Sequence, residues 1–98
     1  MKFTDFKMLR KERSSNGSQA VLDFGKYHLS IINDGFGSDQ GLYEIGVFAA
    51  TDGVASGLTE LPGITVEGDT VKGNLTEADI DAIIVKLYAI TGTEPRQV

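Results

Sequence analysis

The strongest structural signal in the chain lies in residues 75–92, which read LTEADIDAIIVKLYAITG. Thr76 is a natural helix N-cap, and Asp79 stands three residues later, where it approximates a capping box. Gly92 ends the predicted helix, and Pro95 prevents it from resuming. Apolar residues follow the cap at helical spacing and form one stripe, which consists of Ile80, Ile83, Ile84, Leu87 and Tyr88.

The segment before this helix predicts short strands joined by tight turns. Residues 19–24 and 27–32 are rich in β-forming residues, and Gly25-Lys26 stands between them as a two-residue type II′ turn requires. Side chains alternate between the two faces of a strand. In the second strand this alternation places Tyr27, Leu29 and Ile31 on one face and His28, Ser30 and Ile32 on the other.

Residues 42–50 predict a third strand, and Asp52-Gly53 predicts a hairpin back through residues 54–61. Pro62-Gly63 marks the next turn, after which two short strands are expected at 64–66 and 70–72. Such a series indicates an antiparallel meander. Because a sheet with one apolar face must be covered, we expect the helix to cover it. The predicted fold is therefore α+β: a single domain over residues 1–98, with an antiparallel β-meander sheet covered by one C-terminal amphipathic helix.

The N-terminal stretch has two interpretations. Phe3, Phe6 and Leu9 recur at helical spacing after a possible Thr4 cap, which predicts a short helix. The alternative is a strand that forms a hairpin with the next strand through Asn16-Gly17, a favourable turn pair.

Composition excludes several classes of site. Hydrophobic residues make up 41% and charged residues 23%, as in folded globular domains. There is no cysteine, which excludes disulfides, thiolate metal sites and cysteine nucleophiles. The single histidine, His28, rules out a histidine dyad within one chain and is too few for a zinc site. No run of 18 apolar residues occurs and the N-terminus has no apolar stretch, so we expect neither a membrane span nor classical export.

The net charge of −5 is unevenly distributed. Residues 1–13 carry a local +3 and residues 14–98 a local −8. A basic arm of this kind sometimes contacts nucleic acid. We favour a basic first element packed beside an acidic body, because five basic residues without an adjoining basic patch make a small electrostatic footprint. Nucleic-acid binding is also not expected because the aromatic residues occupy core-like positions.

The loop at residues 33–41, which reads NDGFGSDQG, fits neither of two known ligand loops. Its Gly-x-Gly follows a strand, but Gly41 comes one residue too late for a dinucleotide fingerprint and a strand follows it. As a calcium loop it places Glu44 at the twelfth position, but Gly35 and Gly37 stand where side-chain oxygens are needed. We therefore expect a hairpin loop.

No other constellation predicts catalysis. Asp79 and Asp81 are explained by the helix dipole, and the pair Glu67 and Asp69 lies in a Glu-Gly-Asp turn. His28 is expected on a half-exposed sheet face. The sequence predicts no enzyme, no cofactor, and no catalytic, cofactor-binding or metal site. The last candidates for a catalytic role are His28, Asp34 and Asp39.

From Tyr27 onward the chain resembles small accessory proteins encoded by tailed bacteriophages. The resemblance covers about two-thirds of the chain and includes residues 27–32, 43–48, 61–65, 68–73 and the helix, as far as Pro95. It implies a viral origin and a place in the bacterial host cytoplasm. It carries over no catalytic or binding residue.

Together these features predict a non-catalytic protein-interaction module that binds a bacterial host protein or itself. A sheet covered by one helix leaves its second face bare, so we expect a homodimer. The alternatives are a minor virion structural component and an acidic DNA mimic that inhibits a host DNA-binding protein. The candidate interaction residues are Ile32, Phe36 and Phe48.

Overall fold

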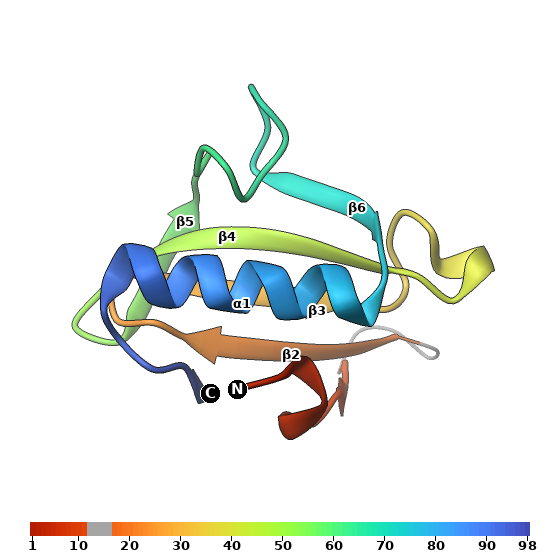
Figure 1. The fold of residues 1–98 in the computed structure, drawn as a ribbon, viewed down its shortest axis with the longest axis horizontal. Helices are drawn as coiled ribbons and strands as arrows, with labels where there is room; N and C mark the ends of the chain where they lie inside the picture. The colour runs from red at the N-terminus through yellow and green to blue at the C-terminus, as the bar shows by residue number, and fades with distance from the viewer. Residues whose placement is uncertain (12–16) are drawn as a thin grey trace.

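The computed structural model describes residues 1–11 and 17–98 and has two layers, an antiparallel sheet and one helix that lies across it (Figure 1). The predicted α+β class, with a sheet covered by a C-terminal helix, is confirmed. The helix, α1, spans Glu77–Thr91, and two 3₁₀ turns, η1 and η2, span Phe3–Asp5 and Ser38–Gln40. The strands are β1 (Leu9–Arg10), β2 (Ser18–Asp23), β3 (Tyr27–Ile32), β4 (Tyr43–Thr51), β5 (Val54–Leu58), β6 (Val71–Leu75) and β7 (Arg96–Gln97).

The first five strands follow one another across the sheet, as a meander does. The last two return to strands already in place: β6 pairs with β4, and β7 pairs with β2. Both outer positions of the sheet are therefore shared by two short strands. β1 and β7 lie beside β2, and β5 and β6 lie beside β4.

The predicted hairpins are present. Asp23 is the partner of His28 across β2 and β3, which leaves a short turn around Gly25-Lys26. Thr51 is the partner of Val54, and Asp52-Gly53 makes the turn between them. Both of these turn residues have positive φ, 53° and 81°, as a type I′ turn requires.

Local capping sets the ends of α1. Thr76 Oγ1 accepts a hydrogen bond from the Asp79 N–H at 3.1 Å, and Asp79 Oδ2 accepts one from the Thr76 N–H at 2.9 Å. Gly92 follows the last turn in the left-handed conformation. Tyr88 was expected in the apolar stripe, but it is 47% exposed. It lies about 100° around the helix from the buried Leu87, and this rotation takes it off the face that meets the sheet.

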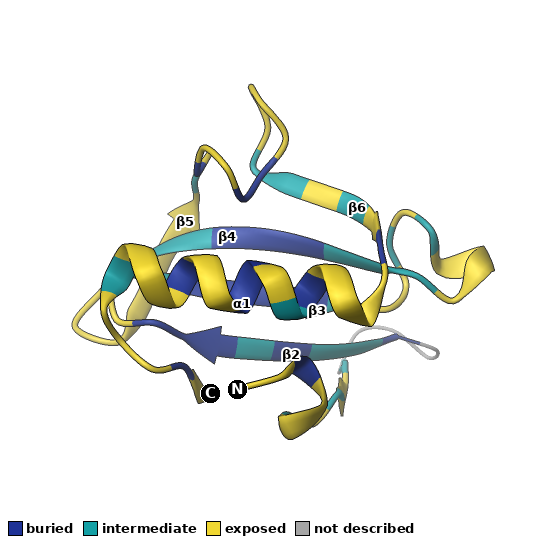
Figure 2. Ribbon diagram, viewed as in Figure 1, coloured by how far each residue is buried: buried dark blue, intermediate teal, exposed yellow. Residues whose placement is uncertain are grey.

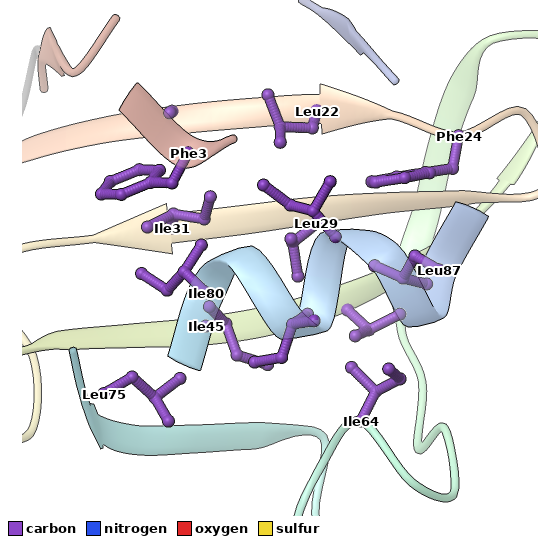
Figure 3. Close-up of a cluster of buried hydrophobic side chains, with 14 of the residues drawn as sticks. Phe3, Leu22, Phe24, Leu29, Ile31, Ile45, Ile64, Leu75, Ile80 and Leu87 are labelled. Atoms are coloured by element: carbon purple, nitrogen blue, oxygen red, sulfur yellow. The ribbon is translucent and has the colours of Figure 1, made fainter. Parts of the chain in front are cut away.

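The hydrophobic core fills the space between α1 and the facing side of β2, β3 and β4 (Figure 3). The helix is buried along that side and exposed along the other (Figure 2). Side chains from the strands, the helix and the loop before β6 point toward one another in this layer. They include Leu22, Phe24, Leu29, Ile31, Ile45, Ile64, Leu75, Ile80 and Leu87.

Residues 64–66 do not form the predicted strand. The Leu61 carbonyl oxygen accepts hydrogen bonds from the N–H groups of both Ile64 and Thr65, each at 3.0 Å, which closes a tight turn. This turn carries the Ile64 side chain into the core. The β-branched residues Ile64, Thr65 and Val66 favour an extended backbone, but the free energy gained by burying Ile64 outweighs this preference.

The N-terminal stretch combines parts of both interpretations. The predicted helix shrinks to η1, and the chain then forms β1, which pairs with β2 as the alternative predicted. Asn16, in the proposed turn, lies outside the described residues. Phe3 is buried: its N–H donates to Asp81 Oδ1 at 2.7 Å, and its ring meets that of Tyr43 edge-on with centroids 5.0 Å apart.

Candidate functional site

The side of the sheet opposite α1 is the candidate functional surface, and we call it the helix-free face. Its members alternate with the core residues of the same strands and form three rows across the sheet. The first row is Leu9, Gln19, Ile32 and Glu44; the second is Val21, Ser30, Gly46 and Val71; the third is Arg96, Asp23, His28, Phe48 and Leu58.

His28 is buried within the third row, with 4% of its surface exposed, so the expected half-exposed position is wrong. Its neighbours across the sheet are Asp23 and Phe48. His28 Nε2 lies 3.5 Å from Asp23 Oδ1 and has no hydrogen-bond partner among the described residues. The imidazole is enclosed by its row instead of facing solvent.

Asp23 is held in its ionised form beside this histidine. The Gly25 N–H donates to Asp23 Oδ1 at 2.7 Å, and this bond lowers the pKa of the Asp23 carboxyl below 3.8. Burial acts in the opposite direction, and the nearby His28 and Arg96 add smaller lowering effects. Arg96 Nη2 lies 3.5 Å from Asp23 Oδ2. The carboxylate thus closes the turn between β2 and β3 and contacts β7 through Arg96.

The second row is closed over by its neighbours. An ideal Cβ on Gly46 would lie 3.4 Å from Leu58 Cδ2 and 3.6 Å from Val71 Cγ1, so these two side chains reach over the glycine. Ser30, the partner of Gly46, is buried, and its Oγ accepts a hydrogen bond from Gln19 Nε2 at 2.8 Å. The centre of the helix-free face is therefore packed without a second helix.

A loop whose backbone is hydrogen-bonded at Phe36 carries this residue at one end of the face. The Phe36 N–H donates to Glu44 Oε2 at 3.2 Å, and the Phe36 carbonyl accepts from the Asn74 N–H at 3.0 Å. Between Lys72 and Leu75, β6 has two residues opposite the single Glu44 of β4, which is a β-bulge. Asn74, in this bulge, has a φ of 58°. Although its backbone is fixed on two sides, Phe36 is 69% exposed.

Two of the three predicted interaction residues, Ile32 and Phe36, are both neighbours of Glu44. Ile32 is the cross-strand partner of Glu44, and the Phe36 N–H donates to the Glu44 carboxylate. Phe48 points to the same face but lies four residues from Glu44 along β4, about 13 Å away at 3.3 Å per residue. Ile32 and Phe48 are half-buried. The hydrogen bond between the Phe36 carbonyl and the Asn74 N–H of β6 had no signal in the sequence beyond the glycines of the loop.

Several of the other residues singled out in the sequence have structural partners. Asp79 caps α1, and Asp69 Oδ1 accepts from the Thr70 N–H at 2.7 Å. Asp34 pairs with Lys11 Nζ at 3.1 Å, which joins the basic N-terminal segment to the acidic body. Asp39 lies in η2. In the described ranges, no three His, Asp or Glu side chains gather as metal ligands would.

Two open hollows lie among the described residues. One, of about 340 Å³, lies between β6 and α1, where Lys72, Asp79 and Lys86 line it. Lys86 Nζ there donates to the Gly63 carbonyl at 3.3 Å. The other, of about 350 Å³, lies against β7 and is lined by Asp23, Gly53, Arg96, Gln97 and Val98.

None of the helices among the described residues is long and apolar enough to cross a membrane. Comparisons with protein-family models, with curated proteins and with solved structures find no match to this chain.

Proposed function

We propose that the protein is a non-catalytic interaction module of the phage accessory type, and that it binds a bacterial host protein in the host cytoplasm. The observation that supports this proposal is the presentation of Phe36. Its backbone is hydrogen-bonded on two sides, while 69% of the residue is exposed. Aromatic side chains are enriched where proteins bind one another, because they bury a large apolar area at little conformational cost.

A fixed backbone strengthens the argument for binding. An exposed aromatic on a mobile loop loses entropy when a partner immobilises it. Phe36 has already lost much of that freedom, since Glu44 and the bulge of β6 hold its main chain. An apolar pocket on the partner would fit the Phe36 side chain. Ile32 and Glu44 of the helix-free face would then lie at the margin of the contact.

The test is a pull-down of the tagged chain from a phage-infected bacterial lysate, read by mass spectrometry after salt washes. We expect one dominant host protein in near-stoichiometric amount. Phe36→Ala should abolish its capture without unfolding the chain, because an exposed side chain contributes little to stability. Tyr88→Ala is the matched control, since Tyr88 is an exposed aromatic on α1. Equal capture by the wild type and Phe36→Ala would contradict the proposal.

The identity of the captured protein separates the alternatives. A host DNA-binding protein that is released by added DNA favours the DNA-mimic function. Capsid or tail proteins favour a minor virion component. One observation supports the virion component: β5, at an edge of the sheet, is exposed along its whole length (Figure 2). An exposed edge strand can pair with a strand of a neighbouring subunit.

A further inference from the structure

The hollow of about 340 Å³ between β6 and α1 has an apolar floor and a lysine on each of two walls. Leu75 from β6 and Ile83 from α1 line it, and only 4% and 5% of their surfaces are exposed. Lys72 lies on the same side of the sheet as α1, because its cross-strand partner is the core residue Ile45. Lys86 follows Ile83 by three residues and so lies on the same side of the helix. Because β6 runs beside the first turns of α1 (Figure 1), strand and helix form the two walls.

Basic residues are rare in this part of the chain. Residues 14–98 contain twelve acidic residues and only four basic ones. Two of these four, Lys72 and Lys86, line this one hollow. With Asp79 as the carboxylate among its lining residues, the hollow carries a formal charge of +1, in a segment whose net charge is −8. Such a local reversal of sign favours an anion at this place.

Both lysines retain free capacity to bind an anion. Among the residues that the structure describes, no salt bridge reaches Lys72 or Lys86. Lys86 Nζ donates one hydrogen bond, to the Gly63 carbonyl at 3.3 Å. An ammonium group has three N–H donors, so most of the donors on the two walls have no protein acceptor in the described ranges.

The Asp79 carboxylate is engaged at the start of α1. Its Oδ2 accepts a hydrogen bond from the Thr76 N–H at 2.9 Å. This bond is the main cause that lowers the pKa of the Asp79 carboxyl, and the charge of Lys72 is the smallest cause. Asp79 therefore acts chiefly as a helix cap and leaves the positive charge of Lys72 largely uncompensated.

We propose that this hollow binds a small organic monocarboxylate. Its carboxylate contacts the ammonium groups of Lys72 and Lys86, and its apolar part packs on Leu75 and Ile83. One negative charge balances the formal +1 of the lining. The volume of the hollow falls at the lower end of the range for small-molecule sites, about 300–1,000 Å³. The inference goes beyond the proposed function, and Phe36 does not line the hollow.

Charge and size distinguish this ligand from other classes. A nucleic acid or another polyanion would extend from the hollow onto the acidic body, which repels it. An inorganic anion would leave the apolar floor exposed to water. A neutral or cationic molecule would leave both ammonium groups without a counter-charge.

The experiment is an NMR titration of the full chain with phenylacetate, at an ionic strength of about 50 mM to limit screening. We expect saturable shifts of backbone amides that line the hollow, Gly73 and Ile83 among them, with a Kd of about 1 mM. Phenylacetamide has nearly the same shape without the charge and should bind at least about fivefold more weakly. Acetate, which lacks the ring, should also bind more weakly than phenylacetate.

Lys72→Gln and Lys86→Gln should each weaken phenylacetate binding about three- to fivefold, because each removes one charge from the walls. Lys26→Gln is the matched control, since Lys26 is the third lysine of residues 14–98 and is exposed in the turn between β2 and β3. It should bind phenylacetate as the wild type does. Phe36→Ala should also bind phenylacetate normally, so failure of this site and failure of host capture can be told apart.

The proposal is overturned if no saturable shift occurs up to about 10 mM phenylacetate, or if the shifts fall on residues outside the hollow. Equal affinity for phenylacetate and phenylacetamide would also overturn it. A third contrary result is a loss of affinity in Lys26→Gln as large as in Lys72→Gln, since that would show a general effect of net charge.

Discussion

The Cβ atom of Phe36 occupies the space in which a side chain at Gly73 would begin: an ideal Cβ on Gly73 would lie only 2.5 Å from it. The Phe36 carbonyl oxygen would lie 3.2 Å from the same point. The loop after β3 and the bulge of β6 therefore interlock through the absence of one side chain. This contact connects the position of an exposed aromatic to a glycine 37 residues later in the chain.

Gly73→Ala should displace the Phe36 loop. The added methyl group would clash with the Cβ and the carbonyl oxygen of Phe36, and neither atom can shift unless the loop backbone shifts. We therefore expect a loss of about 1–3 kcal/mol in the free energy of unfolding. Capture of the host protein should fall as well, since Phe36 shifts. Urea unfolding measures the first effect and the pull-down the second.

Gly46→Ala is the matched control for this substitution, because Gly46 is also a strand glycine but its nearest foreign atoms would be 3.4 Å and 3.6 Å away. It should lose less stability than Gly73→Ala and capture the host protein normally. Equal effects of the two substitutions would show that the Phe36 contact is not what makes Gly73 necessary.

Because Asp23 is ionised in the folded chain, the free energy of unfolding should fall at acidic pH. The pKa of Asp23 is lowered below 3.8 in the folded chain, chiefly by the Gly25 N–H, so folding favours the ionised carboxylate. A lowered pKa adds stability that is fully present above the unfolded-state value and is lost as pH falls through the folded-state value. We expect Asp23→Asn to destabilise the chain near neutral pH, and the difference from the wild type to shrink as the pH falls below about 4.

Urea unfolding of both proteins across this pH range measures that difference. The Asp79 carboxylate, whose pKa is also lowered, remains in both proteins and therefore cancels in the comparison. A difference that grows toward low pH would contradict the assigned role of Asp23.

Loss of the N-cap should weaken α1. Thr76→Ala removes the acceptor for the Asp79 N–H and should lower the free energy of unfolding by about 1 kcal/mol. Thr76→Ser retains the hydroxyl and should restore most of that stability. Thermal unfolding by circular dichroism compares the two variants, and an alanine variant as stable as the wild type would exclude the cap as a source of stability.

Some elements could be predicted because their causes lie within a few residues. The cap of α1 joins Thr76 to Asp79, and the Asp52-Gly53 turn needs two adjacent residues with positive φ. The pairing of β6 with β4 and of β7 with β2 had no such local cause. The core also took Ile64 out of its predicted strand, since burial of that side chain required a turn.

The residues of the candidate surface could likewise be predicted only in part. Alternation along the second predicted strand correctly placed Ile32 and His28 on one face, because side chains of a strand alternate regardless of what packs on them. How deeply His28 is buried depended on Asp23 and Phe48 in the neighbouring strands, and the fixed position of Phe36 depended on Glu44 and the bulge at Gly73.

The sequence by itself thus determined the helix, the main hairpins and the two-faced pattern of the sheet, since each arises from contacts between residues close in the chain. Only the tertiary structure decided which edge of the sheet stayed open and where Phe36 is held. The physical reason is that both depend on segments that meet only after the chain has folded: the loop after β3, the bulge of β6, and the returns of β6 and β7 to strands already paired.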